Sequence, residues 1–379
     1  MSGDARLRLG AATLAWDGGA LSITTALGDA TTLRVTLHGS RTLLERIEPR
    51  TEPFLPMALL VAAAVGSHLD VAEPVDPDYL VSLRLGYLPL LTYLYALPAI
   101  EVRAPGPGRR ASVRIRRPRV RGHPPDPAAL LYSGGVDSLF SFIRLRQVGH
   151  PLRLLLNVNA GAHGPSRALM TRRFERVDAF ARAVGMGSLL IDTNFHELLA
   201  IPHQTIWPIR NLPAAFTLHG VLAGLVSSTA RAFQEISYGH AGGFIGDLGA
   251  RLNSSLAWAR MPVTEVGYEA TRYDKLRTVA DEPLSYHALD VCLDARYQLA
   301  AGPSDPVNCG DCHKCSRVLV ALDRMARLDR FGTQFDLERY ATNRDAILTR
   351  IEAQDEIEFT SPLHPAAAVA PAFRLTPSA

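Results

Sequence analysis

Hydrophobic and polar residues alternate along the start of the chain, with the period of strands that bury one face. Turn residues such as Asp17-Gly18-Gly19 interrupt this alternation. The pattern predicts three short strands, at Arg6 to Ala15, Leu21 to Thr25 and Thr32 to His38.

Two apolar segments follow, Pro56 to Val65 and Leu83 to Tyr95, and both predict helices. Pro89 lies inside the second segment and predicts a break or kink there. The longest uninterrupted apolar stretch, Phe54 to Val65, is shorter than the roughly 18 residues that suggest a membrane span. We therefore expect a buried helix here and no membrane partner.

The pattern changes after His123-Pro124-Pro125-Asp126-Pro127, which predicts a domain boundary. Beyond it, apolar strands alternate with amphipathic helices, as is typical of an α/β, Rossmann-like domain with helices on both faces of a parallel sheet. Ligands of such sheets bind at the carboxyl ends of the strands. The predicted strands are Ala128 to Tyr132, Leu152 to Val158, Leu189 to Asp192 and Glu235 to Tyr238; the predicted helices are Val136 to Gln147, Arg167 to Val184 and Leu212 to Phe233.

Length and composition divide the chain further. A chain of 379 residues is too long for one ordinary core, so we expect an N-terminal α+β domain over 1–125 and a catalytic domain over 126–330. Residues 331–379 should form a helix, Leu337 to Ile357, and a tail rich in Pro and Ala. The hydrophobic fraction of 47% excludes a largely disordered chain, and the net charge of +3 allows a nucleotide ligand without requiring a nucleic acid. No secretory signal opens the chain, which predicts a cytoplasmic protein.

Seven arginines crowd residues 109–121 and would suit phosphate groups or an RNA backbone. Val113 and Ile115 alternate with these arginines in the period of a half-exposed strand, however, and no aromatic residues interleave with them for stacking on bases. We therefore favour a solvated strand and linker over a nucleic-acid site.

A glycine-rich loop joins the first strand of the α/β part to its first helix. Gly134 and Gly135 allow the backbone to approach a ligand closely, and the N–H groups that open the helix favour an anion. Ser133 and Ser138 add hydroxyl groups, and Asp137 would hold Mg²⁺ or fix a loop N–H. The alternative is a plain glycine turn, and the loop lacks the lysine of the Walker motif. The predicted phosphate-binding residues are Ser133, Gly134, Gly135, Val136, Asp137 and Ser138.

All four cysteines of the chain lie near its end, as Cys292 and the C-x2-C-x2-C motif Cys309, Cys312 and Cys315. Four thiolates complete a tetrahedral zinc site with no open position, so the zinc would be structural. A [4Fe–4S] cluster also uses closely spaced cysteines plus a remote one and is the alternative. Zinc is preferred.

The loop sequence Ser-Gly-Gly-Val-Asp-Ser after an apolar strand resembles the signature of the PP-loop ATP pyrophosphatases. The resemblance implies an adenine nucleotide alpha-hydrolase-like fold and an enzyme that cleaves ATP to AMP and pyrophosphate. Members of this superfamily adenylate a carboxylate or carbonyl oxygen, and ammonia or a sulfur donor then displaces AMP.

The loop and the cysteines together resemble the 7-cyano-7-deazaguanine synthases, which convert a carboxylate to a nitrile through adenylation and ammonia attack. Trp207-Pro208-Ile209-Arg210-Asn211 resembles the Pro-Gly-Arg-Asn motif of that family, with Ile209 in place of Gly, and is expected to open the long helix. Arg210 would bind a phosphate or carboxylate and Asn211 a purine-like edge. The alternative is a plain helix start with Asn211 as its N-cap.

Three further segments agree more loosely with the family. Val158 and Asn159 fall where the superfamily backbone contacts adenine, and Gly239 follows the fourth predicted strand at the same sheet edge. Arg272 and Lys275 would neutralise phosphate charge during adenylation, or else face solvent on a helix. With these two cations, Asp137 and Ser138 complete the predicted catalytic set.

The resemblance covers about residues 128–325 and leaves residues 1–125 without a counterpart. Similar proteins with added domains occur in bacterial antiphage operons, where the adenylated deazaguanine would be joined to a protein or nucleic acid. The expected function is therefore ATP-dependent ligation of a carboxylated deazapurine-like small molecule, with ATP, Mg²⁺ and Zn²⁺, and with the N-terminal part as a surface for a protein partner or acceptor. The alternatives are a tRNA sulfur-transferase and a non-catalytic nucleotide-binding subunit of a larger complex.

Overall fold

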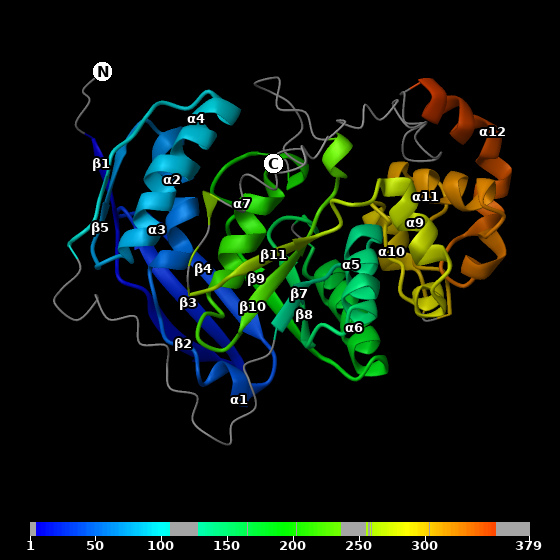
Figure 1. Cartoon of the computed structure of the whole chain (residues 1–379), viewed down its shortest axis with the longest axis horizontal. Coiled ribbons are helices and arrows are strands. Elements are labelled where there is room, and N and C mark those ends of the chain that lie inside the picture. The colour runs from blue at the N-terminus through cyan, green and yellow to red at the C-terminus, as the bar shows by residue number, and fades with distance from the viewer. Residues whose placement is uncertain are drawn as a thin grey trace, which may run out of the picture.

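The computed structural model describes residues 5–106, 128–164, 166–201, 203–235, 255–256, 258, 260–302 and 304–353 (Figure 1). Their strands form one sheet in the order β11-β10-β7-β8-β9-β4-β3-β1-β5-β6, with β2 paired only to β3. Helices flank this mostly parallel sheet, which confirms the α/β prediction.

The half of the sheet that follows residue 127 is parallel throughout its described strands. The loop-bearing strand β7 lies at its centre, between β8 and β10. The strands of this half are β7 (Ala128–Leu131), β8 (Leu152–Asn159), β9 (Gly187–Thr193), β10 (Gly224–Ser228) and β11 (Val263–Val266).

The N-terminal strands extend the same sheet. β4 runs antiparallel to β9, with Val35 opposite Thr193 and His38 opposite Leu190. The N-terminal third is therefore joined to the α/β part by a strand ladder, and the predicted boundary near residue 126 falls outside the described residues. The strands of this half are β1 (Arg6–Leu9), β2 (Thr13–Asp17), β3 (Ala20–Leu27), β4 (Thr31–His38), β5 (His68–Val71) and β6 (Val102–Arg103).

Two hydrophobic cores contain the packed helices, and Figure 1 shows the two groups of helices on opposite sides of the sheet. The first core joins the N-terminal strands to α1 (Arg41–Leu44), η1 (Glu52–Phe54), α2 (Leu55–Ala64), α3 (Pro77–Ser82), η2 (Leu83–Tyr87), α4 (Leu88–Tyr95) and α7 (His203–Phe216). The second core contains residues of α5 (Val136–Gln147), α6 (Arg167–Ala183), α9 (Arg272–Ala280), α11 (His313–Arg324), η6 (Leu328–Phe331) and α12 (Leu337–Ala353). The short η3 (Phe233–Glu235), η5 (Pro283–His287) and α10 (Ala295–Ala300) complete the described elements.

The apolar stretch that was expected to be a buried helix is α2, and its burial confirms the prediction. The chain stays helical through Pro89, and the irregularity expected there is a change of helix type. A π-helical turn, η2, precedes α4, and Pro89 occupies the first turn of α4. No helix among the described residues is long and apolar enough to cross a membrane.

The predicted helix from Leu212 to Phe233 is wrong. α7 ends at Phe216, and the strand β10 occupies the middle of the predicted range. Gly220 adopts a positive φ of 78° in the connection, which an α-helix does not allow, and Leu225 and Val226 are buried in the sheet between β7 and β11. Of the predicted strand at 235–238, Glu235 belongs to η3 and the rest lies outside the described residues.

Candidate functional site

The glycine-rich loop leaves β7 after Leu131 and enters α5 at Val136. Gly134 has a φ of +76°, and a Cβ atom there would lie 3.1 Å from the carbonyl oxygen of Ala288. Both the backbone conformation and the available space therefore require glycine. Gly135 is the N-cap residue of α5, so the loop leads directly to free helix N–H groups.

The two serine hydroxyls hold the loop in shape. Ser138 Oγ donates to the carbonyl oxygen of Gly135 at 3.0 Å and lies 3.3 Å from the backbone nitrogen of Ser133. The backbone N–H of Gly135 in turn donates to Ser133 Oγ at 3.4 Å. Ser138 is therefore placed as a residue that shapes the loop.

The structure brings three of the predicted catalytic residues together at the start of α5. Arg272 forms an ion pair with Asp137, with its terminal nitrogen 2.8 Å from Oδ2, and Lys275 Nζ lies 3.8 Å from Oδ1. Lys275 is completely buried and donates to the carbonyl oxygen of Thr229 at 2.7 Å. Burial lowers the pKa of Lys275, while the neighbouring Asp137 opposes that effect.

A cavity of about 740 Å³ opens in front of this loop, at the carboxyl ends of β7, β8 and β10. It lies within the range of roughly 300–1,000 Å³ that is typical of small-molecule sites. All predicted phosphate-binding residues except Gly134 line it, together with Val158, Asn211 and Arg272. The structure thus gathers at one cavity residues that lie far apart in the sequence.

Several other predicted residues lie outside the cavity wall. Lys275 sits behind Asp137, and Asn159 turns to Asp192, to which its Nδ2 donates at 2.8 Å. Arg210 is buried and donates to the carbonyl oxygen of Leu199 at 3.0 Å. Gly239 and the arginine-rich span 109–121 lie outside the described residues.

The Trp-Pro-Ile-Arg-Asn motif was expected to open a helix and instead lies in the interior of α7. Asn211 is therefore not an N-cap residue. Trp207 and Asn211 are one helical turn apart, and both line the cavity.

Two histidines that sequence reasoning missed line the same end of the cavity. Burial lowers the pKa of His163 to about 3 and that of His203 to about 4, so both rings are neutral at pH 7. His163 follows the carboxyl end of β8 by four residues, and this position in a parallel sheet is the signal that could have found it.

Seven buried polar atoms of the cavity residues have no hydrogen-bond partner among the described residues: Tyr132 Oη, Asp137 Oδ1, Asn157 Oδ1, His163 Nε2, Asn211 Oδ1, Ser228 Oγ and Arg272 Nε. Buried polar groups in folded proteins almost always find partners, in the protein, in water or in a ligand. These atoms could be satisfied by water or by a polar molecule, which makes the cavity a candidate binding site.

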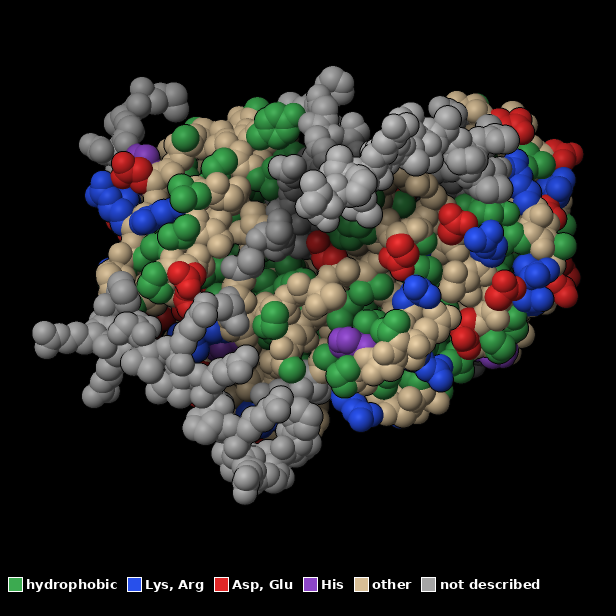
Figure 2. All heavy atoms as spheres, viewed as in Figure 1, with side chains coloured by type: hydrophobic (Ala, Val, Ile, Leu, Met, Phe, Trp, Pro, Cys, Tyr) green, Lys and Arg blue, Asp and Glu red, His purple; other side chains and the backbone are tan. Residues whose placement is uncertain are grey.

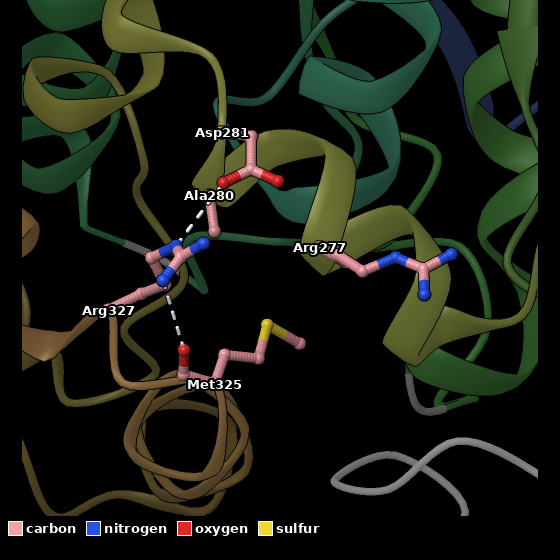
Figure 3. Close-up of a pocket in the computed structure, with 5 residues that line it drawn as sticks. All are labelled: Arg277, Ala280, Asp281, Met325 and Arg327. Atoms are coloured by element: carbon pink, nitrogen blue, oxygen red, sulfur yellow. Dashed lines mark hydrogen bonds and ion pairs between the residues drawn. The ribbon is translucent and has the colours of Figure 1, made fainter.

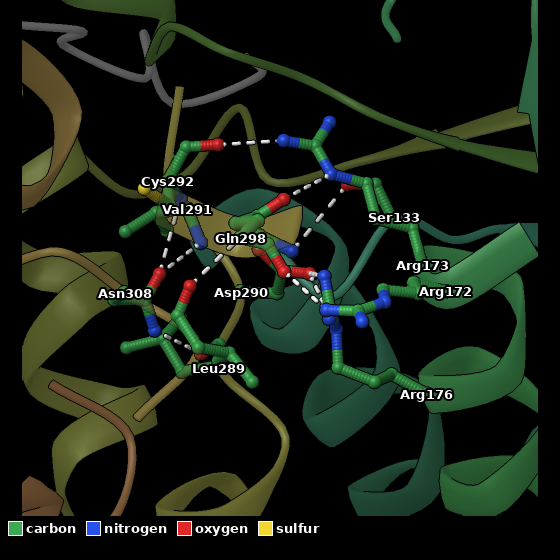
Figure 4. Close-up of polar contacts among 12 residues, drawn as sticks. Ser133, Arg172, Arg173, Arg176, Leu289, Asp290, Val291, Cys292, Gln298 and Asn308 are labelled. Atoms are coloured by element: carbon green, nitrogen blue, oxygen red, sulfur yellow. Dashed lines mark hydrogen bonds and ion pairs between the residues drawn. The ribbon is translucent and has the colours of Figure 1, made fainter. Parts of the chain in front are cut away.

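A polar network ties the loop to the segment that carries Cys292 (Figure 4). The N–H of Asp290 donates to the carbonyl oxygen of Gly134 at 2.9 Å, and Arg176 holds the Asp290 carboxylate with a contact of 2.6 Å. Arg173 donates to the carbonyl oxygen of Cys292 at 2.7 Å and contacts His163 at 3.1 Å. The cavity wall and the cysteine cluster are therefore parts of one hydrogen-bonded unit.

The four cysteine sulfurs lie within 4.8 Å of one another, and three of the cysteines are buried. Tetrahedral zinc with bonds of about 2.3 Å places its sulfurs about 3.8 Å apart, so the cluster is compatible with zinc. Backbone N–H groups of Cys312, Leu293 and Asp294 point at the sulfurs, at 3.3 to 3.4 Å. Such N–H groups stabilise thiolates, and a hydrogen bond with Cys292 lowers the pKa of Cys309 to about 7.

The backbone around the cysteines is fixed by two neighbours of Cys309. Gly310 has a φ of +77°, and a Cβ atom there would overlap the carbonyl oxygen of Asp336. Asn308 is completely buried, and its side chain accepts from the N–H groups of Val291 and Cys292 at 2.8 and 3.0 Å. The cluster is therefore preformed by the fold.

A second, smaller hollow of about 240 Å³ lies near the C-terminal ends of α9 and α11 (Figure 3). Arg327 crosses it to Asp281 at 3.2 Å and to the carbonyl oxygen of Met325 at 3.3 Å. Arg327 and Asp281 are thus paired with each other, and Arg277 pairs with Asp274 at 3.1 Å. Figure 2 shows acidic and basic side chains interspersed over the C-terminal helices at the right of the view, so the described part of this face is not a continuous basic surface.

Comparisons with known proteins identify no relative: no protein-family model matches the chain, and no significant match was found among curated proteins or solved structures.

Proposed function

We propose that the cavity binds ATP and cleaves it to AMP and pyrophosphate, in order to activate a carboxylate of a deazapurine-like molecule for attack by ammonia or another amine. The observation that carries this proposal is the position of the loop. A glycine-rich strand-to-helix turn, with the N–H groups of α5 behind it, faces a cavity of nucleotide size that also contains unpaired polar atoms.

The cations around Asp137 suit an adenylation reaction. A carboxylate oxygen of the substrate attacks the α-phosphorus of ATP, the bond from that phosphorus to the bridging oxygen breaks, and pyrophosphate leaves with the electron pair. Arg272 at the cavity wall would stabilise the charge that develops on the phosphate oxygens. The amine then attacks the acyl carbon, the bond to AMP breaks, and the amine loses a proton.

The other end of the cavity suits a flat, uncharged heterocycle. His163 and His203 are neutral, Trp207 offers an aromatic face, and Asn211 has an unpaired carbonyl oxygen. An amide and a neutral imidazole can donate to and accept from a purine-like edge without burying an unpaired charge.

Two metal ions belong to the proposal. Zinc at the four cysteines would stabilise the structure, because four thiolates leave no position for a substrate. Mg²⁺ would accompany the nucleotide and neutralise phosphate charge, with the Asp137 carboxylate as the acidic group nearest the loop.

The test is ATP turnover by the purified full chain with Mg²⁺, ammonia and 7-carboxy-7-deazaguanine, with AMP and ADP separated by chromatography. We expect AMP and pyrophosphate to form in step with an amidated or nitrile product. ATP without the deazapurine should persist, which is the control for adventitious hydrolysis. Formation of ADP, or no turnover with this substrate, would refute the proposed reaction.

A further inference from the structure

Both lysines of the chain lie at or next to the cavity. Lys275 and Lys314 are the only two lysines in the chain, and the other 38 of its 40 basic residues are arginines. Lys275 lies behind Asp137, and Lys314 lines the cavity. Both lysines of this arginine-rich chain therefore lie at one site, and a lysine ammonium is a more compact and more strongly hydrated charge than an arginine guanidinium.

The position of Lys314 follows from the cysteine cluster. Cys312 is the N-cap residue of α11, and Cys315 is buried one residue beyond Lys314. Both flanking sulfurs belong to the same group of four, so the backbone that carries Lys314 is held from both sides. The side chain reaches the cavity that Asp137 and Arg272 also line.

The other cations near the loop already have partners. Arg272 pairs with Asp137, Lys275 donates to Thr229, and Arg173 donates to the carbonyl oxygen of Cys292 and to Gln298. Lys314 makes no hydrogen bond or ion pair in the part of the chain that the structure describes. Its amino group is therefore open to a ligand in the cavity.

We infer that Lys314 binds the β- and γ-phosphate oxygens of ATP and so supplies from α11 the lysine that the glycine-rich loop lacks, with the four-cysteine cluster as the support that positions it. This inference rests on the proposed function. As the bond between the α-phosphorus and the bridging oxygen breaks, Lys314 Nζ donates hydrogen bonds to the departing pyrophosphate and stabilises its added charge. A ligand that lacks these phosphates, such as AMP, gains nothing from Lys314.

The first test uses the wild-type chain, because its only amino groups are two lysines and the N-terminus. Limited acetylation followed by mass spectrometry should modify the half-buried Lys314 faster than the fully buried Lys275. ATP or pyrophosphate at about ten times its Kd should slow acetylation of Lys314 about tenfold, and AMP at equal saturation should not. Equal protection by AMP, protection by the deazapurine carboxylate but not by pyrophosphate, or no protection by bound ATP would overturn the inference.

The second test compares affinities measured by calorimetry. Lys314→Gln should weaken ATP and pyrophosphate binding about tenfold or more, because a hydrogen bond to a charged group contributes about 1.5–3 kcal/mol. AMP binding should change less than about twofold on the same reasoning, and Lys314→Arg should restore part of the loss. Arg324→Gln, at the exposed last turn of the same helix, is the matched control and should bind all three ligands as the wild type does.

The outcomes separate the two proposals. A wild-type chain that does not bind ATP refutes the proposed function. A wild-type chain that binds ATP, with a Lys314→Gln variant of unchanged zinc content that binds it equally well, refutes the role of Lys314 and leaves the proposed function standing. If the Gln variant loses zinc, the protection experiment on the wild-type chain decides the question alone.

Discussion

The backbone N–H of Asp290 donates a 2.9 Å hydrogen bond to the carbonyl oxygen of Gly134. This bond joins the loop before α5 to the segment that ends at Cys292, although the two lie more than 150 residues apart. Arg176 and Gln298 hold the Asp290 carboxylate at 2.6 and 2.9 Å, so the connection is itself supported. The loop therefore depends on residues around the cysteine cluster for its position.

Replacement of Gly134 by Ala tests the rigidity of the loop. The positive φ and the 3.1 Å approach to the Ala288 carbonyl should lower the free energy of unfolding by about 1–3 kcal/mol and abolish ATP binding. Gly149→Ala is the matched control, because Gly149 has a similar φ of +65° but nothing within 4 Å. Chemical denaturation and calorimetry measure both variants. A Gly134→Ala variant that binds ATP normally would show that the loop does not contact the nucleotide.

Replacement of Asp137 by Asn tests the ion pairs beneath the loop. Arg272 loses its partner and the buried Lys275 loses its nearest negative charge, so turnover should fall at least tenfold while the fold persists. Glu269→Gln breaks the exposed pair with Arg144 and should cost less than about 1 kcal/mol with unchanged turnover. If Asp137→Asn turned over ATP as fast as the control, Asp137 would not be a catalytic residue.

Local pattern was enough to predict the elements that carry the loop. The helix Val136 to Gln147 has the predicted bounds, because its apolar spacing and the preceding glycines are local signals. The ladder between β4 and β9 leaves no such signal, since it joins residues about 150 positions apart. Around Gly220 a local signal was present but predicted the wrong element, a helix in place of β10. The apolar residues around Gly220 have a pattern that predicts a helix. Leu225 and Val226 form a strand because they pair with β7 and β11 on either side.

The candidate site was predictable where its residues form a compact motif. The loop and the four cysteines are such motifs, and the structure gathers each of them. Arg210 belongs to a five-residue motif, yet its side chain is buried and donates to the carbonyl oxygen of Leu199. His163 could have been found from its position just after a predicted strand, whereas Lys314 reaches the cavity only through the arrangement of strands and helices.

Removal of metal tests the structural role of the cysteine cluster. A chelator should lower the melting temperature of the wild type markedly, because the free energy of metal binding contributes to folding. Cys312→Ser should melt at a lower temperature without chelator and shift little further when chelator is added. Elemental analysis should give one zinc per colourless chain; a brown protein with iron would favour the iron–sulfur alternative. A wild-type melting temperature that is insensitive to complete metal removal would contradict the structural role.

The acid stability of the chain should depend on His219, which does not line the cavity. His219 packs against Trp258, and neither of its ring nitrogens has a hydrogen-bond partner in the described part of the chain. Burial together with the nearby Arg50 lowers its pKa from 6.5 to about 4. The unfolded chain therefore binds more protons than the folded chain between these values, so the free energy of unfolding falls as the pH drops from about 6.5 to 4. At about 1.4 kcal/mol per pH unit, His219 contributes roughly 3 kcal/mol of this loss.

Replacement of His219 by Phe should remove that part of the acid sensitivity, because an uncharged ring of similar shape cannot bind the proton. Denaturation at pH 7 and at pH 4.5 gives the difference for each chain. His163 and His203 keep their own lowered pKa values, so part of the loss should remain in the variant. His287→Gln, an exposed histidine, should retain the full wild-type difference. An equal pH difference in His219→Phe and the wild type would mean that His219 is not buried as a neutral ring.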